Sequence, residues 1–201
     1  VNIGTLSPQM MEGARAAIAG AHAAGRPWVL DPVACQATTY RRAASAELAG
    51  LEPAIIRGNA SEILSLAGEE SRGQGVDGRD AVEMAEDGAR RLAAKIGAVV
   101  AVTGEVDYVT DGTREVWISG GSSFMPMNTA MGCSLTGLCG AYAAVADDPF
   151  DAAVGALTHF AVAGTLAHKD ANGPGSFAPL FLDALHAVAP DDLQREAEVA
   201  A

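Results

Sequence analysis

The chain is poor in aromatic residues and in basic residues. Aromatic side chains make up only 5 % of its 201 residues, whereas apolar residues as a whole make up 49 %, so the core must be built mainly from Ala, Val, Leu and Ile. Thirteen Lys and Arg residues face 25 Asp and Glu residues, which gives a formal net charge of −12. Nucleic acid is therefore excluded as a partner, because binding its phosphate backbone requires clustered Lys and Arg. A small anion is not excluded, since a local site needs only one or two basic groups and backbone N–H groups.

Cysteine and long apolar runs are also scarce. The three cysteines, Cys35, Cys133 and Cys139, do not have metal-ligand spacing, and an odd number of them favours a reduced, cytoplasmic compartment. Uninterrupted apolar runs stay below the ~18 residues of a membrane span, so we expect no membrane partner. The chain begins at Val1 with strand-like sequence already under way, and we therefore expect the natural protein to begin earlier.

Apolar strands alternate with helices along the chain. Strands are predicted over residues 1–6, 26–31, 54–57 and 98–103, and a β-hairpin over 106–119, where an Asp-Gly pair suits the turn. Helices are predicted over residues 8–24, 40–49, 59–67, 80–96, 133–146, 151–168 and 177–188, and a polar loop over 68–78. Continuously apolar strands separated by helices are typical of a parallel sheet covered on both faces. We expect one α/β domain over residues 1–201, with a mostly parallel central sheet.

Polar residues follow the ends of several predicted strands, where ligands bind in sheets of this kind. Asp31 follows one strand, and Pro32 holds its backbone extended. Thr103 and Gly104 end another strand with a hydroxyl and a flexible residue. The alternative for Asp31 is a turn carboxylate that accepts hydrogen bonds from nearby backbone N–H groups.

The segment from Arg57 to Glu62 is more specific. Arg57 is unusual at the end of a buried strand, and its planar guanidinium can hold phosphate oxygens. Glu62 could reach a divalent ion, since Mg²⁺ usually takes one or two protein carboxylates and keeps several waters. The structural alternative is a capping box, in which Asn59 and Glu62 together begin a helix.

Residues 128–140 lead from small polar residues into an apolar helix. The free N–H groups at such a helix start attract phosphate, and the same field would favour the ionised form of the Cys133 thiol. The alternative is a closely packed helix start with a small cysteine. Together with the strand-end residues, the segment indicates phosphoryl transfer. The chain has neither a Walker A motif nor a Gly-x-Gly-x-x-Gly dinucleotide fingerprint after a strand.

Motifs at residues 2–6, 28–33, 57–63, 102–104, 132–135 and 173–177 occur in this order along nearly the whole chain. In this arrangement the sequence resembles the hydroxyethylthiazole kinase family, which has the ribokinase-like fold. The resemblance implies ATP- and Mg²⁺-dependent phosphorylation of the hydroxyl of 4-methyl-5-(2-hydroxyethyl)thiazole, in thiamine biosynthesis or salvage. It also implies a cytoplasmic homotrimer with sites at the subunit interfaces.

The resemblance also implies roles for individual residues. Cys133 stands where sugar kinases of the superfamily carry a catalytic Asp; a thiolate there could accept the hydroxyl proton, and a neutral thiol could only position it. Asp31 and Glu62 belong to the magnesium environment. ATP and phosphate contacts fall to Arg57, Asn59, Thr103, Gly104 and Gly132, and substrate contacts to Ala130 and Gly132.

The sequence departs from the family pattern in two loops and at its start. Ala130 and Ala34 each stand where the family usually has Gly, and the family's first segment is absent. If position 130 requires a positive φ, Ala costs about 1–2 kcal/mol there. Two alternatives therefore stay open: a kinase for a related alcohol such as a hydroxymethylpyrimidine, and a nucleotide-binding protein of this fold with impaired turnover.

Overall fold

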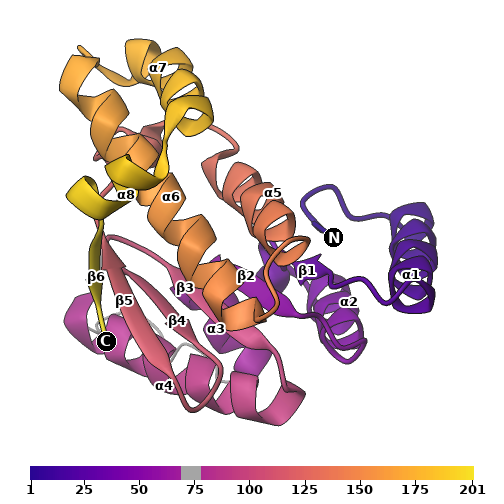
Figure 1. Cartoon of the computed structure of the whole chain (residues 1–201). Helices are drawn as coiled ribbons and strands as arrows, with labels where there is room; N and C mark the ends of the chain where they lie inside the picture. Colours follow the sequence, from indigo (N-terminus) through magenta and orange to yellow (C-terminus); the bar gives the residue numbers. More distant parts are fainter. Residues whose placement is uncertain (69–77) are drawn as a thin grey trace.

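The computed structural model describes residues 1–68 and 78–201 and contains a six-stranded mixed sheet in sequential order (Figure 1). Its strands are β1 (Val29–Leu30), β2 (Ile55–Asn59), β3 (Val99–Thr103), β4 (Asp107–Thr110), β5 (Glu115–Ser119) and β6 (Glu198–Ala200). Strands β1, β2 and β3 are parallel, and every pairing from β3 to β6 is antiparallel. The sheet is therefore parallel only in its first half, because β3, β4 and β5 follow one another through short reversals that cannot join parallel strands.

The strand predicted over residues 1–6 is much shorter in the structure. Over residues 1–6 the backbone forms a single parallel bridge, between Asn2 and Asp31. The predicted hairpin is confirmed as β4 and β5, which are joined by residues 111–114. The polar loop expected over residues 68–78 lies almost wholly outside the described residues.

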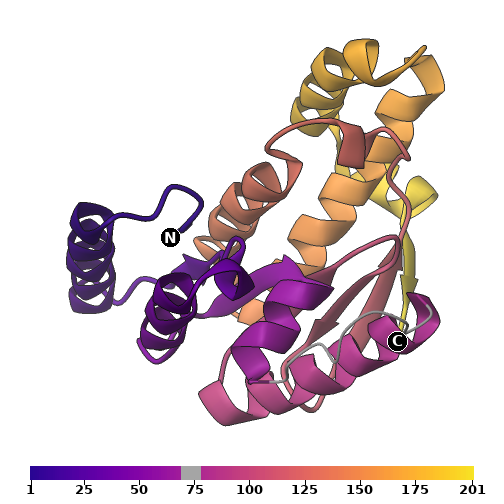
Figure 2. The same ribbon diagram turned by 180° about the vertical axis from the view of Figure 1, so that it is seen from behind.

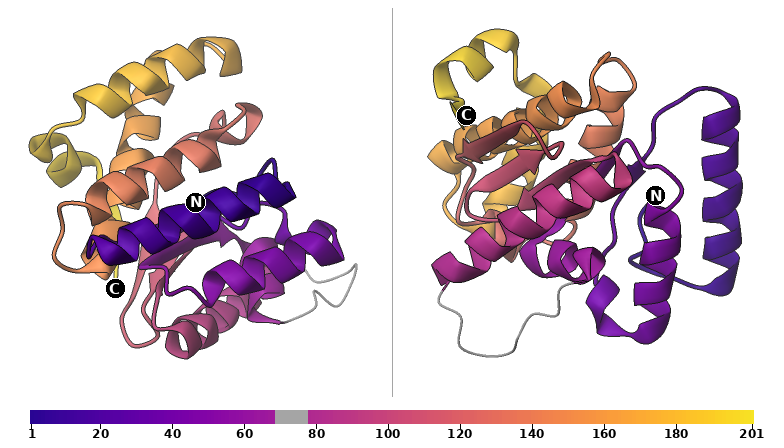
Figure 3. Two further views of the ribbon diagram at one scale, coloured as in Figure 1. Left: turned by 90° about the vertical axis from the view of Figure 1, so that its right-hand side faces the viewer. Right: turned by 90° about the horizontal axis from the view of Figure 1, so that it is seen from below.

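Helices cover both faces of the sheet, as predicted. They are α1 (Pro8–Ala23), α2 (Thr39–Ala49), α3 (Ala60–Ala67), α4 (Gly78–Ile96), α5 (Met131–Ala143), α6 (Pro149–Asp170), α7 (Pro174–Ala187) and α8 (Pro190–Glu196), with short 3-10 turns η1 (Cys35–Ala37) and η2 (Met125–Met127). Figure 1 shows α5 and α6 on one face, and Figure 2 shows α2, α3 and α4 on the other. Helix α1 lies at the periphery, beside α2 (Figure 3).

Alternate strand residues point to two separate cores, as expected for a sheet buried on both faces. Ile55, Val99 and Ala101 pack with α5, α6 and α7, whereas Ile56 and Val100 pack with the helices of the other face. Helix α6 is the long central helix of the first core. Among the described residues it is the one helix long and apolar enough, by length and composition alone, to cross a membrane, and 61 % of its most apolar stretch is buried inside the protein.

Candidate active site

A cleft of about 930 Å³ lies at the carboxyl ends of β2 and β3, beside the start of α5. Five of the predicted site residues line it: Arg57, Thr103, Gly104, Ala130 and Gly132. They come from three separate segments of the chain. Their convergence confirms the expectation that the ends of these strands share one edge of the sheet.

Arg57 is the basic group at the centre of this arrangement. Its Nη2 donates a hydrogen bond of 2.6 Å to Thr103 Oγ1, and its buried Nε has no hydrogen-bond partner among the described residues. The guanidinium packs so tightly on Gly132 that a Cβ at Gly132 would lie 2.6 Å from Nη1. A guanidinium against the positive end of α5 brings two positive groups together, an arrangement that favours an anion.

Asp31 lies fully buried just beyond β1. Its Oδ2 accepts hydrogen bonds from Asn2 Nδ2 at 2.7 Å and from Thr136 Oγ1 at 2.8 Å. Its Oδ1 has no hydrogen-bond partner among the described residues and lies 3.9 Å from Arg57 Nη1. Burial raises the pKa of Asp31, and the Thr136 hydrogen bond and the Arg57 charge oppose that rise. The side-chain donors come from distant segments, so the carboxylate is not the local turn cap considered as the alternative.

Asn59 and Glu62 form the capping box that the sequence pattern allowed. Asn59 Oδ1 accepts from the Glu62 N–H at 3.0 Å, and Glu62 Oε2 accepts from the Asn59 N–H at 2.9 Å. Glu62 Oε1 also accepts from the Ala34 N–H at 2.8 Å, which ties α3 to the loop after β1. The Asn59 side chain is thus engaged in beginning α3, and the cleft-lining residues do not include it.

Asp31 and Glu62 supply two carboxylates as possible protein ligands for a magnesium ion. Among the described side chains, those of residues 1–68 and 84–201, no three His, Cys, Asp or Glu residues cluster as a metal cage. Mg²⁺ does not need one, because it takes one or two carboxylates together with waters and substrate phosphates. The unpartnered Oδ1 of buried Asp31 is the oxygen that suits such an ion. Glu62, whose two oxygens each accept a backbone hydrogen bond, suits a water-mediated contact.

Cys133 is the exposed cysteine at the start of α5, whereas Cys35 and Cys139 are buried. Its Sγ accepts a hydrogen bond of 3.3 Å from Asn2 Nδ2. Burial raises the pKa of Cys139 to about 12 and also raises that of Cys35, so both thiols stay protonated. Of the three thiols, Cys133 is therefore the exposed one, and it lies directly after the cleft-lining Gly132 without being among the residues that line the cleft.

Ala130 and Ala34, where the resemblance implied glycine, both have left-handed backbone conformations. Ala130 has φ 68° and ψ 10°, and Ala34 has φ 52° and ψ 37°. A Cβ is disfavoured in this region of backbone space. The backbone strain predicted for Ala130 if its φ is positive is thus present, and Ala34 in the loop after β1 adopts a similar conformation.

Replacing Ala130 by Gly should relieve that strain. We expect Ala130→Gly to raise the free energy of unfolding by about 1 kcal/mol, because Gly adopts positive φ without steric penalty. Ala141→Gly, at an exposed helical position of α5, is the matched control and should instead lower it by about 0.5–1 kcal/mol. Urea unfolding of both variants measures the difference; a loss of stability in Ala130→Gly would contradict the prediction.

Three further polar residues at the site were not assigned a role from the sequence. Asn2 and Thr136 both donate to Asp31, and Asp107 lines the cleft at the start of β4. Thr136 lies one turn after Gly132 on α5, so helical spacing could have placed it on the same face. The sequence carried no signal for Asp107, because its place depends on the turn from β3 into β4.

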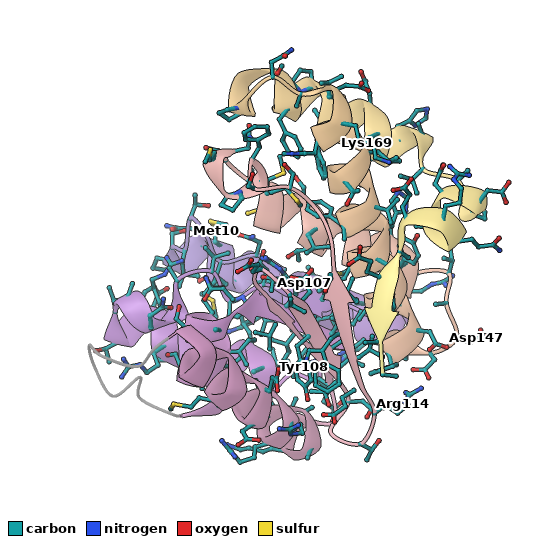
Figure 4. The ribbon with its side chains drawn as sticks, turned by 90° about the vertical axis from the view of Figure 1, so that its left-hand side faces the viewer. Met10, Asp107, Tyr108, Arg114, Asp147 and Lys169 are labelled. Carbon is teal, nitrogen blue, oxygen red and sulfur yellow. The ribbon has the colours of Figure 1, made fainter. Side chains whose placement is uncertain are left out.

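Asp107 is a half-buried carboxylate near Arg57, at the end of the hairpin remote from Arg114 (Figure 4). Its Oδ1 accepts from the Gly104 N–H at 3.0 Å. Burial raises its pKa to about 6, against the opposing effects of that hydrogen bond and of the Arg57 charge. The native protein therefore holds this proton more tightly than the unfolded chain does.

This raised pKa of Asp107 predicts a pH-dependent stability. Its penalty is absent below about pH 4, grows as pH rises to about 6, and is complete above that, because only the ionised form is disfavoured in the folded state. We expect Asp107→Asn to raise the free energy of unfolding by about 1–3 kcal/mol at pH 8 and to leave it nearly unchanged at pH 4. Denaturation at the two pH values tests this, with the exposed Asp183→Asn as control. An equal effect at both would contradict it.

The fold is the α/β fold of the ribokinase-like class. Two solved structures share the fold at low identity. One is an ADP complex of Bacillus subtilis pyridoxal kinase, with TM-score 0.57 and 22 % identity, covering 76 % of this chain and 59 % of that one. The other is Vibrio cholerae fructokinase bound to fructose, ADP and potassium, with TM-score 0.60 and 20 % identity, covering 88 % and 54 %.

Closer matches identify the family within that class. A profile of the hydroxyethylthiazole kinase family matches residues 1–191, and the chain belongs to this family. It is 62 % identical over 200 residues to a hydroxyethylthiazole kinase of Rhizobium etli and 57 % identical over 201 residues to one of Cereibacter sphaeroides. These alignments cover 99 % and 100 % of this chain, and 78 % and 76 % of the relatives. The hydroxyethylthiazole kinase structure of Pyrococcus horikoshii matches with TM-score 0.89 and 33 % identity, covering 99 % and 74 %.

Proposed function

We propose that this chain transfers the terminal phosphoryl group of ATP to the hydroxyl of 4-methyl-5-(2-hydroxyethyl)thiazole, a step of thiamine salvage. The observation that carries the proposal is the packing of the Arg57 guanidinium on Gly132 at the start of α5, with Cys133 directly after it. Membership of the hydroxyethylthiazole kinase family supports the acceptor. In that reading, Ala130 and Gly132 contact the acceptor at the cleft wall.

Charge stabilisation falls to Arg57 and the backbone of α5. The guanidinium and the free N–H groups at the helix start would hold the oxygens of the phosphoryl group, where negative charge is spread in the transition state. Thr103 accepts a hydrogen bond from Arg57 and so orients it, and Gly104 lines the phosphate end of the cleft beside it. Mg²⁺ bound by Asp31, and through water by Glu62, would neutralise further phosphate charge.

Proton transfer falls to Cys133. It follows Gly132 directly at the start of α5, so we infer that its Sγ faces the acceptor hydroxyl and takes the hydroxyl proton as oxygen attacks phosphorus. Neither of the other cysteines can replace it, because both are buried and protonated. Asn59 would contribute only indirectly, by beginning α3 and positioning Glu62.

The assembly and location belong to the proposal as well. We propose a cytoplasmic homotrimer whose subunits are single domains over residues 1–201. The family resemblance carries this part of the proposal, because the exposed large apolar side chains, such as Met10, Met127, Val145 and Leu182, are spread over several elements. Sedimentation of the purified protein tests the subunit number.

An acceptor panel tests the proposed activity against its alternatives. Purified protein with ATP and Mg²⁺ is assayed with the thiazole alcohol and with a hydroxymethylpyrimidine, and Cys133→Ala defines the background. We expect a phosphorylated product from the thiazole alcohol well above that background. Turnover of the pyrimidine alone would instead assign the related-alcohol activity. Nucleotide binding by calorimetry without any transfer would assign the protein with impaired turnover.

A further inference from the structure

We propose that Asn2 is a positioning residue that fixes the Asp31 carboxylate and the Cys133 thiol relative to one another. Its single amide nitrogen donates to both groups, at 2.7 Å to Asp31 Oδ2 and at 3.3 Å to Cys133 Sγ. No other residue has a recorded hydrogen bond to Cys133 Sγ within the described part of the chain. The inference rests on the proposed function, which gives these two groups the metal and the proton to handle.

The backbone holds Asn2 in place opposite Asp31. The two residues form a parallel bridge, in which the Asp31 N–H donates to the Val1 carbonyl at 2.9 Å and the Ile3 N–H donates to the Asp31 carbonyl at 3.2 Å. These two backbone hydrogen bonds flank Asn2 on either side. The Asn2 side chain therefore projects from a segment that is itself anchored to the loop carrying the carboxylate.

The orientation of the Asn2 amide is set by Gly4. The Gly4 N–H donates to Asn2 Oδ1 at 2.8 Å, so the oxygen is fixed on that side and the nitrogen must face Asp31 and Cys133. An amide turned the other way would place its oxygen against a carboxylate and lose this bond. Gly4 also leaves the room that the amide needs, because a Cβ there would lie 2.9 Å from Asn2 Oδ1.

The consequence for Asp31 is that its two carboxylate oxygens have different surroundings. Asn2 and Thr136 together occupy Oδ2, which leaves Oδ1 without a hydrogen bond and nearest to Arg57. Asn2 thus helps to leave one particular oxygen of Asp31 facing Arg57, which itself lines the cleft. The consequence for Cys133 is an N–H donor against its sulfur, which orients the sulfur. In general an N–H donor stabilises a thiolate more than a thiol, and the thiolate is the form that alkylating reagents attack.

Three variants separate this role from a purely structural one. Asn2→Ala removes the amide, Gly4→Ala displaces it without altering Asn2, and Thr136→Val removes only the other donor to Asp31. The first readout is the rate at which iodoacetamide alkylates Cys133 in the absence of nucleotide, which depends on neither substrate nor turnover. The second is kcat and KM with ATP and the thiazole alcohol, and thermal unfolding reports whether each variant is folded.

We expect alkylation of Cys133 to slow severalfold in Asn2→Ala and in Gly4→Ala and to keep its rate in Thr136→Val. We expect kcat to fall about 10- to 100-fold in Asn2→Ala, with KM for ATP little changed, because misplaced reacting groups slow the chemical step more than nucleotide binding. An unchanged or faster alkylation in the folded Asn2 and Gly4 variants would overturn the inference. Absence of kinase activity in the unaltered protein would instead refute the proposed function, while the alkylation rates would still decide the role of Asn2.

Discussion

Gly132→Ala should lower kcat/KM by about 10²- to 10³-fold while leaving the protein folded. The added Cβ would lie 2.6 Å from Arg57 Nη1 and 3.0 Å from Nη2, so the guanidinium must move and give up its hydrogen bond to Thr103. Moving one preorganised cation away from developing phosphoryl charge removes transition-state stabilisation of this size. Steady-state kinetics with ATP and the thiazole alcohol measure the loss.

Gly137→Ala provides the matched control on the same helix. A Cβ at this exposed position of α5 meets nothing within 4 Å, and Ala is the better helix former by about 1 kcal/mol. We therefore expect Gly137→Ala to keep its activity and to unfold at a slightly higher temperature. Equal activity in the two variants would show that Arg57 does not act from the position it has beside Gly132.

Cys133→Ala should lower kcat by about 10²- to 10⁴-fold, the range for losing a general acid–base group. The side chain is exposed at the start of α5, so its removal leaves no cavity and the free energy of unfolding should change little. Cys133→Ser has a hydroxyl in place of the thiol, which can orient the acceptor but ionises far less readily. We therefore expect its kcat to lie between that of the unaltered protein and that of Cys133→Ala. Single-turnover measurements separate the chemical step from product release.

Ser134→Ala is the neighbouring control for Cys133. Its hydroxyl is exposed and donates only to the carbonyl of Ala130, so we expect kcat to stay close to that of the unaltered protein. A Cys133→Ala variant with kcat within threefold of the unaltered protein would remove the general-base role. The thiol would then act through packing alone, and proton transfer would have to pass to solvent.

The local sequence predicted well where helices begin and which loop residues beside the cleft have unusual backbone conformations. Ser7 begins α1 with Pro8 in its first turn, and Asn59 and Glu62 form the predicted capping box. Ala34 and Ala130, where the resemblance implied glycine, do have positive φ. Each of these features depends on residues within one or two turns of each other, and such neighbours allow few local backbone conformations.

The sequence was a poorer guide to which strands pair in parallel and which pair antiparallel. The continuous apolar runs at β2 and β3 indicated parallel strands, whereas β6 is a short exposed strand that joins β5 from the far end of the chain. No periodicity over three exposed residues can predict such a pairing. The pairing of β6 with β5 depends on where α8 ends, and hence on the packing of the preceding helices.

The sequence by itself determined most of the segments that form helices and strands, though not α8 or β6, and it determined which strand ends carry polar groups and which family the motifs resemble. Only the tertiary structure decided how those groups meet. Asp31 is held by Asn2 and Thr136, which lie 29 and 105 positions away, and Asn2 reaches Cys133 across 131 positions. Contacts over such separations form only when the sheet and α5 pack together, because that packing offsets the entropy lost in closing long loops of chain.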